Sequence, residues 1–379
     1  MKEKRLELVC ACAAAFAFSS NYTNHAPLAP MLMKQFGFTL AMSGLLTTGI
    51  FLTHAAMQVP GGHLADRYGG RRVLAWALAI VCAGNVGIAF ATSYAALLFW
   101  KVFAGFGTGT CFVAGARYLA QTMPADGLAR AQGYYGGSVL LGSGFVIYAV
   151  PCAAESLGWS GAFLTTAVVA MAVLACWIAF APSPGPAPQP GVSLSSLLGH
   201  GQLWLLGLVQ MASFGLVIVI GSWITQLLRA QAGLSSAAAG ALGSLVLLIG
   251  IASRPLGGAL ARSLPVRLLV MASLGMNIAG CLLLSRGGSW FGGIVSGIVL
   301  LGVGCGLPYA ALFNRAAQLF PGRAGAAIGL VNMLGIVMIL GGAPLVGLLT
   351  GWTGSFHAAF VSLAAFSAAV LLAAFFIRD

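Results

Sequence analysis

The chain has 379 residues, of which 60% are hydrophobic and only 6% are charged, and its mean hydropathy is +0.98. Soluble domains carry about 25% charged residues, so this chain could not cover a water-facing surface. The net charge of +12 lies mainly in short gaps between apolar runs, which is typical of membrane-topology signals and not of a nucleic-acid-binding surface. We therefore expect an integral membrane protein with the lipid bilayer as its surroundings and no nucleic-acid partner.

The apolar runs are long enough to cross a membrane as helices, which takes about 20 residues each. Twelve runs meet this length: 7–33, 40–61, 72–91, 94–121, 129–152, 159–181, 202–228, 235–261, 265–285, 289–319, 324–350 and 354–377. The predicted fold class is an all-α membrane protein with twelve transmembrane helices in two pseudo-symmetric six-helix bundles.

A proline-rich stretch, PSPGPAPQPGVSLSSLLGHG, lies near the middle of the chain. Its prolines cannot continue a helix, so we predict an N-terminal bundle over 1–181, a cytoplasmic linker over 182–201 and a C-terminal bundle over 202–379. Placing both termini in the cytoplasm puts most basic residues on the inside and leaves Lys34, Arg229 and Arg286 outside. Cytoplasmic loops of membrane proteins are enriched in Lys and Arg, so this orientation is favoured.

The two halves resemble each other. GFGTGTCFVAGARYLAQTMP, from Gly105, aligns without a gap with GVGCGLPYAALFNRAAQLFP, from Gly302, and LGWSGAF corresponds to TGWTGSF. The double glycines Gly61–Gly62 and Gly257–Gly258 follow at nearly the same offset. Duplicated six-helix halves around a binding site at the midplane are a known plan of transporters.

Between the second and third spans stands GGHLADRYGGRRVL, residues 61–74. Glycines at a short turn let two helices approach closely, and the arginines would anchor the turn on the cytoplasmic side. The stretch resembles the loop motif of the major facilitator superfamily, G-x-L-a-D-r-x-G-r-r, with Gly70 in place of the usual basic residue.

The resemblance extends over the whole chain through the twelve spans, the linker and the duplication. It implies a secondary transporter that works by alternating access, through rocking of its two halves, and we expect a monomer in a bacterial inner (plasma) membrane. It also implies that the motif is a conformational latch and not the substrate site. The expected latch residues are Gly62, Asp66, Arg67, Gly69, Arg71, Arg72 and Arg117.

Arg254 stands in an otherwise apolar or small-residue run, IGIASRPLGGAL. All six acidic residues map to loops or ends of the predicted spans, so the membrane interior has no carboxylate to balance it. Arginine stays protonated under ordinary conditions, and an anionic solute would balance the charge. A structural arginine that binds helix carbonyl groups is the alternative. Lys101 is expected either to extend its ammonium toward the membrane surface or to bind carbonyl groups between helices.

The duplication places Arg254 opposite Gln58. Nitrate/nitrite porters of the superfamily carry arginine at both symmetric places, and this chain is similar at Arg254 only. Oxalate and organic-anion carriers likewise resemble it in using a basic residue in the eighth span. The common implication is a small anionic solute, either an organic carboxylate or an inorganic oxyanion such as nitrate or nitrite.

Polar residues inside the other spans could complete this site. Asn21 and His25, and likewise His54 and Gln58, are four residues apart and are expected to share a helix face. The full predicted substrate-binding set is Arg254, Gln58, His54, Asn21, His25, Tyr134, Trp223, Gln226 and Asn332.

Two other functions remain open at this stage: export of neutral or hydrophobic compounds, and a non-transporting receptor on the same fold. The sequence contains no nucleophile–base constellation, no metal-ligand spacing and no phosphate loop. It therefore predicts no enzyme, no cofactor and no metal site.

Overall fold

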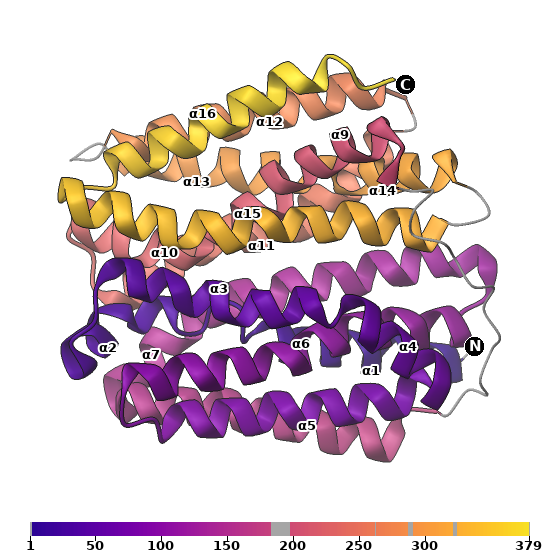
Figure 1. The fold of residues 1–379 in the computed structure, drawn as a ribbon, viewed down its shortest axis with the longest axis horizontal. Helices are drawn as coiled ribbons and strands as arrows, with labels where there is room; N and C mark the ends of the chain where they lie inside the picture. Colours follow the sequence, from indigo (N-terminus) through magenta and orange to yellow (C-terminus); the bar gives the residue numbers. More distant parts are fainter. Residues whose placement is uncertain (1, 183–197, 262, 287–290, 321–323, 379) are drawn as a thin grey trace. The chain divides into compact units, whose positions relative to one another are not determined.

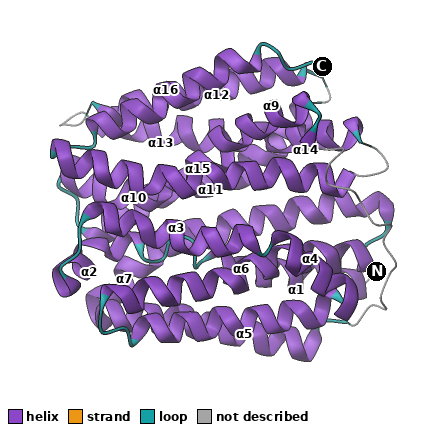
Figure 2. Cartoon of the chain, in the orientation of Figure 1, coloured by secondary structure: helices purple, strands orange, loops and turns teal. Residues whose placement is uncertain are grey.

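In the computed structural model the described residues form helices joined by turns and loops, and they include no strand (Figure 2). Residues 1, 183–197, 262, 287–290, 321–323 and 379 lie outside the described part, as do the side chains of 2–5, 59, 66, 125–130 and 324–326. The predicted all-α class is confirmed. Nine described helices have the length and apolar composition to cross a membrane, and Leu6–Ser19 and Leu40–Ala56 are shorter apolar helices.

The chain divides into two compact units. Unit 1 comprises Met1–Phe38 and Leu45–Pro190, and unit 2 comprises Thr39–Gly44 and Gly191–Asp379. The predicted linker falls almost entirely outside the described residues, so the predicted domain boundaries stay a prediction. Each unit is described by itself below.

The first half of the chain, shown in indigo to magenta in Figure 1, carries the elements of the predicted spans one to six. They are α1 (Lys2–Ser19), η1 (Ala26–Leu28), α2 (Ala29–Phe36), α3 (Leu40–Ala56), α4 (Gln58–Tyr68), α5 (Gly70–Ala89), α6 (Tyr94–Thr122) and α7 (Ala125–Phe180). Spans five and six are the two parts of α7, which meet at Gly158, whose φ of 68° is not helical.

The second half carries the elements of spans seven to twelve. They are α9 (Gly201–Gln210), the π-helix η2 (Met211–Gly215), α10 (Leu216–Ala232), α11 (Ser236–Leu260), α12 (Val266–Ser285), α13 (Phe291–Gly306), α14 (Pro308–Leu319), α15 (Ala324–Thr353) and α16 (His357–Ala374). The tenth span comprises α13 and α14, which join at Leu307 with helical backbone angles (φ −53°, ψ −46°).

The expectation of one continuous first span over 7–33 is wrong. Residues 20–25 form turns between α1 and η1. The polar run SSNYTNH explains the break, because its side chains bind main-chain groups and so compete with the helical hydrogen bonds.

Small residues set the spacing of the helices in each unit. A methyl group at Gly107 of α6 would lie 2.7 Å from the carbonyl oxygen of Ala77 on α5. In unit 2 a methyl group at Gly280 of α12 would lie 2.9 Å from the carbonyl oxygen of Gly297 on α13. Backbones of membrane helices approach this closely only where side chains are small. Gly107 and Gly280 are therefore packing residues.

Candidate functional site

Arg254 lies on α11 and is only 7% exposed. Its guanidinium carbon is 3.9 Å from the ring centroid of Tyr309 on α14. Cation–aromatic contact of this kind stabilises a cation by about 0.5–2 kcal/mol, with the larger values where the groups are desolvated. Tyr309 therefore holds the charged group in place without neutralising it.

The helix α11 lies close to the chain at Leu307, two residues before Tyr309. Gly257 of α11 allows this, because a methyl group there would collide with the carbonyl group of Leu307. Ser253 donates to the carbonyl oxygen of Gly302 at 3.1 Å and ties α11 to α13. Sequence reasoning missed Tyr309. The sequence offers one signal next to it, which is a proline, Pro308, inside a predicted span. In the structure Pro308 is the first residue of α14.

The seventh span contains the π-helix η2, which three other helices contact. Asn277 of α12 donates to the carbonyl oxygen of Ala212 at 2.8 Å, and Ser213 donates to that of Cys305 on α13 at 2.5 Å. Just before η2, the Gln210 amide donates to Oδ1 of Asn332 on α15 at 3.3 Å. A π-bulge in a helix is often found at a functional site. Asn332, predicted as a site residue, thus lies at this irregular turn.

Trp223 and Gln226 are both buried on α10, one turn apart. The Trp223 indole donates its N–H to the carbonyl oxygen of Ala343 on α15 at 2.9 Å. This bond fixes α10 against α15 and occupies the single polar atom that Trp223 offers to a solute.

In unit 1 the break in the first span surrounds a buried lysine. Lys101 on α6 is 1% exposed, and its ammonium donates to the carbonyl oxygen of Asn21 at 2.8 Å and to Oδ1 of Asn24 at 2.5 Å. The Asn24 amide in turn donates to Oδ1 of Asn85 on α5 at 3.3 Å. The expectation that Lys101 binds carbonyl groups between helices is confirmed.

Two further residues of the break, Thr23 and His25, contact other helices of unit 1. Thr23 donates to the carbonyl oxygen of Ser143 on α7 at 2.8 Å, and Ser143 donates back to that of Ser19 at 3.1 Å. His25 Nε2 lies 3.0 Å from Oγ1 of Thr47 on α3. Residues 20–25 are not α-helical, so the expectation that Asn21 and His25 share a helix face is wrong. The Asn21 amide instead donates back to the carbonyl oxygen of Ala17 at 3.2 Å.

His54 and Gln58 do lie together. The Gln58 amide donates to the His54 carbonyl oxygen at 3.4 Å, across the short interruption at Met57. The His54 ring lies among aromatic rings, 5.4 Å from that of Tyr22, and its Nδ1 is 3.1 Å from Oγ1 of Thr108. Gln58 lies in unit 1 and Arg254 lies in unit 2.

Tyr134 is 56% exposed on α7. The next residue, Tyr135, is the buried one, and its hydroxyl donates to the carbonyl oxygen of Cys111 at 2.9 Å. The ring of Tyr135 also packs near those of Phe18 and Phe112. The side chain that joins the polar and aromatic interior of unit 1 is therefore Tyr135, which the sequence did not single out.

The motif turn is fixed by its glycines and by Arg71. Gly69 has φ 86° and ψ 140°, a conformation that favours glycine. Arg71 donates through Nε to the carbonyl oxygen of Ala181 at 2.5 Å and through Nη2 to that of Ile178 at 2.7 Å. Ile178 lies in the last turn of α7 and Ala181 directly follows the helix, and a cation at a helix C-terminus is favoured by the helix dipole.

The position that departs from the family pattern has a packing reason. A methyl group at Gly70 would lie 2.9 Å from both the carbonyl oxygen of Ala114 and the amide nitrogen of Tyr118, so α5 begins in direct contact with α6. The other predicted latch residues differ in their exposure. Gly62 and Arg117 are half-buried, Arg67 lies 5.2 Å over the Tyr68 ring, Arg72 is exposed, and the Asp66 side chain lies outside the described residues.

A family model described as the Major Facilitator Superfamily matches residues 11–335. The chain belongs to the Major Facilitator Superfamily. This superfamily protein is 25% identical to a "Probable sulfoacetate transporter" of Cupriavidus necator, over 100% of this chain and 94% of the relative. It is 24% identical to a "Probable nitrate transporter" of Staphylococcus epidermidis, over 91% of this chain and 89% of the relative.

A solved structure matches the fold along nearly the whole chain. It is a crystal structure of a bacterial homolog of the human lysosomal transporter Spinster in an inward-facing and occupied conformation. The TM-score is 0.78 at 17% sequence identity, and the match covers 98% of this chain and 96% of that one. At this identity the likeness shows the shared superfamily fold.

Proposed function

We propose that this superfamily member is a secondary transporter that moves a small anionic solute by alternating access, with Arg254 as the residue that binds the anion. The solute carries a carboxylate, a sulfonate or an inorganic oxyanion group. The observation that carries the proposal is a guanidinium buried inside a membrane-spanning helix and stacked on Tyr309.

Placing a charged side chain in the membrane interior costs free energy. Ionisable residues within membrane helices are rare and usually mark the path of a substrate or an ion. The N–H groups of a guanidinium form two-pronged hydrogen bonds with carboxylates and oxyanions. An anion bound there would gain about 1.5–3 kcal/mol for each such bond.

The named relatives support the same solute class. One name states sulfoacetate and the other nitrate. Both solutes are anions with planar or trigonal oxygen groups, and they differ in size and in number of charges. We therefore specify the charge and the oxygen group of the solute but not the individual compound.

The remaining predicted residues have supporting roles in this proposal. His54, Gln58, Asn21, His25, Gln226 and Asn332 provide polar groups inside the two units, whereas Tyr134 and Trp223 provide aromatic surface. Arg71 and the motif glycines form the latch of the moving halves, together with Asp66, Arg67, Arg72 and Arg117. We place the protein in a bacterial inner membrane, as a monomer with both termini in the cytoplasm.

The test is exchange flux in proteoliposomes with sulfoacetate, oxalate, nitrate, nitrite and a neutral solute of similar size such as glycerol. We expect flux for at least one anion and none for glycerol. Arg254→Gln should abolish it and Arg254→Lys should retain part of it, whereas Arg286→Gln, which removes an exposed arginine after α12, should leave it unchanged.

Three results would overturn the proposal. Normal anion flux in the Arg254→Gln variant would show that the arginine does not bind the solute. Transport or binding of neutral compounds only would favour an exporter, and solute binding without flux would favour a receptor.

A further inference from the structure

The tenth span contains a proline that leaves one carbonyl group without its helical donor. In an α-helix each carbonyl oxygen accepts from the N–H four residues later, and Pro308 has no N–H to donate to the carbonyl oxygen of Gly304. The backbone at Leu307 is nevertheless helical, and Pro308 is buried. A carbonyl group without a donor inside a membrane costs free energy, so Gly304 needs a donor from outside its own helix.

A serine of the neighbouring helix supplies this donor. The Ser273 hydroxyl of α12 donates to the carbonyl oxygen of Gly304 at 2.5 Å, and Ser273 is fully buried. Gly304 permits the close approach of α13 to α12, because a methyl group there would collide with Oδ1 of Asn277. Ser273 therefore takes the place of the N–H that Pro308 lacks.

The π-helix η2 in the seventh span has a similar arrangement. The N–H of Leu216, which in an α-helix would bind the Ala212 carbonyl oxygen, bonds that of Met211. The Ala212 carbonyl oxygen accepts from the Asn277 amide at 2.8 Å. Ser273 and Asn277 are four residues apart on α12 and share a face of that helix. One face of α12 thus supplies donors to irregular turns in two neighbouring spans.

The two irregular turns are also bonded to each other. Ser213 of η2 donates to the carbonyl oxygen of Cys305, the residue after Gly304, at 2.5 Å. The Cys305 thiol donates to Oδ1 of Asn277 at 3.4 Å. The carbonyl groups of Gly304 and Cys305 are therefore both bound by serines from other segments, just before α13 joins α14.

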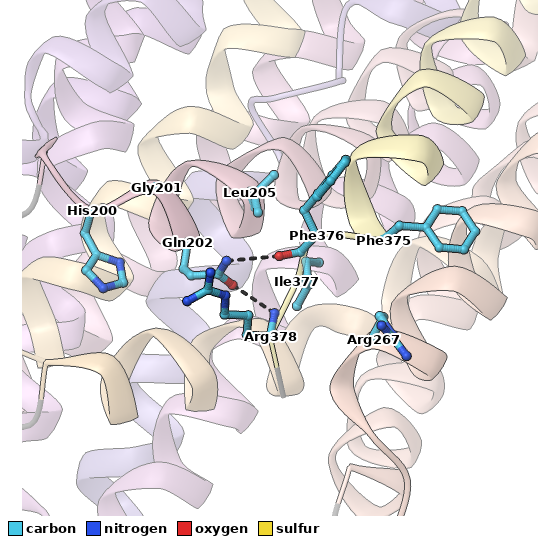
Figure 3. A pocket seen from close by; sticks show the side chains of 9 residues that line it. All are labelled: His200, Gly201, Gln202, Leu205, Arg267, Phe375, Phe376, Ile377 and Arg378. Carbon is cyan, nitrogen blue, oxygen red and sulfur yellow. Dashed lines mark hydrogen bonds between the residues drawn. The ribbon is translucent and has the colours of Figure 1, made fainter.

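The start of the seventh span is anchored separately. The Gln202 side chain of α9 donates to the carbonyl oxygen of Phe376 at 3.0 Å, and its Oε1 accepts from the main-chain N–H of Arg378 at 3.0 Å (Figure 3). These bonds tie α9 to the end of the last span, and η2 directly follows α9. Ser213 therefore belongs to a span whose start is fixed.

The proline occurs only in the half of the chain that carries Arg254. The aligned repeats pair Cys111 with Pro308, and in unit 1 the helix α6 continues through this position. The repeated fold therefore does not require a proline here. Tyr309, whose ring lies 3.9 Å from the guanidinium carbon of Arg254, directly follows the proline.

We propose that Ser273 and Ser213 are positioning residues of the anion site. Their hydroxyl groups bind the two carbonyl groups before the joint of α13 and α14, and so fix the position from which Tyr309 contacts Arg254. Loss of either hydroxyl should weaken solute binding without removing a group that touches the solute. The inference rests on the proposed function, because its readout is the affinity of the solute that Arg254 binds.

The test is a double-mutant cycle on the full-length protein. Affinity is measured by calorimetry for sulfoacetate or nitrate, whichever gives the higher exchange flux in proteoliposomes. Ser273→Ala should weaken binding about three- to eighteenfold, the equivalent of one hydrogen bond inside a membrane. Pro308→Ala restores a main-chain N–H that can donate to Gly304, so in that background Ser273→Ala should change the affinity by less than about twofold.

A second cycle separates positioning from general stability. In the Tyr309→Leu background, Ser273→Ala and Ser213→Ala should each weaken binding by less than about twofold, because the contact that they position is already absent. Ser244→Ala is the matched control, since the buried Ser244 hydroxyl of α11 bonds the carbonyl oxygen of Ala241 in its own helix at 2.8 Å. It should leave the affinity unchanged.

Three results would overturn the inference: unaltered affinity in Ser273→Ala, equal weakening with and without Pro308→Ala, or full additivity with Tyr309→Leu. Ser213→Ala carries the same expectation for the Tyr309→Leu cycle if Ser273→Ala does not fold. Melting temperatures keep a failure of the proposed function apart. If Arg254→Gln binds the solute normally, the role in an anion site is wrong, whereas a lower melting temperature of Ser273→Ala that Pro308→Ala suppresses would still support the replacement of the missing N–H.

Discussion

Replacing Lys101 by methionine should destabilise unit 1 and slow transport, because Lys101 holds the break in the first span. The substitution keeps a long flexible side chain in the buried position but removes both hydrogen bonds of the ammonium, to the carbonyl oxygen of Asn21 and to Oδ1 of Asn24. A hydrogen bond inside a membrane contributes about 0.6–1.7 kcal/mol. We therefore expect a loss of about 1–3 kcal/mol in the free energy of unfolding.

The free energy of unfolding can be measured by denaturant titration in mixed micelles. Lys34→Met is the matched control, because Lys34 is an exposed lysine in the last turn of α2, and it should change the value by less than about 0.5 kcal/mol. A double-mutant cycle with Asn24→Ala should show that the two effects are not additive, since both residues belong to one hydrogen-bond chain.

Transport kinetics distinguish a positioning role from contact with the solute. If Lys101 positions the break, Lys101→Met should lower the maximal flux and leave the KM for the solute nearly unchanged, and Lys101→Arg should restore part of the flux. An unchanged stability with a strongly raised KM would refute this reasoning and place Lys101 in the binding site.

Three further substitutions test particular contacts. Tyr309→Leu should weaken solute binding about two- to thirtyfold, because it removes up to about 2 kcal/mol of cation–aromatic stabilisation from Arg254, and binding isotherms would show whether it does. Arg71→Gln should lower the melting temperature, as it uncaps the end of α7; an unchanged value would mean that its two bonds contribute nothing. Gly69→Ala should lower the unfolding free energy by about 1–2 kcal/mol through strain at positive φ, whereas Gly62→Ala, where no atom lies within 4 Å of an added methyl group, should not.

The order of helices was predictable because the bilayer fixes their length and composition. Every predicted span has a helical counterpart, including the C-terminal spans over 235–261 and 265–285, which correspond to α11 and α12 within a residue or so. The motif between the second and third spans was equally clear, since its positive-φ glycine and its basic residues follow from the turn itself.

The interruptions inside spans could not be predicted from hydropathy. The break at residues 20–25 depends on partners in α5, α6 and α7, and the π-helix at Met211–Gly215 depends on Asn277 and Cys305 from other helices. Hydropathy averages over a window and does not register which polar side chain finds a carbonyl group across the bundle. Tyr309 was missed for a related reason, because a tyrosine in an apolar run looks like ordinary core.

The choice among neighbouring residues was also beyond the sequence. Tyr134 and Tyr135 are chemically alike, and only the rotation of α7 decides that the second one is buried. Asn21 and His25 are four apart, but the spacing rule applies only to a continuous helix. In each case the residue type indicated a possible role. Tertiary packing then determined whether the side chain is buried and which residues lie next to it.

The most direct test of the central claim is the affinity of the purified protein for its anion, measured by calorimetry with the solute that gives the highest exchange flux. If Arg254 binds the anion, we expect Arg254→Gln to weaken binding by about 10- to 150-fold. This factor corresponds to the loss of one charge-assisted hydrogen bond worth about 1.5–3 kcal/mol. Arg286→Gln should bind as the unaltered protein does. Equal affinity in the Arg254→Gln variant and the unaltered protein would contradict the account.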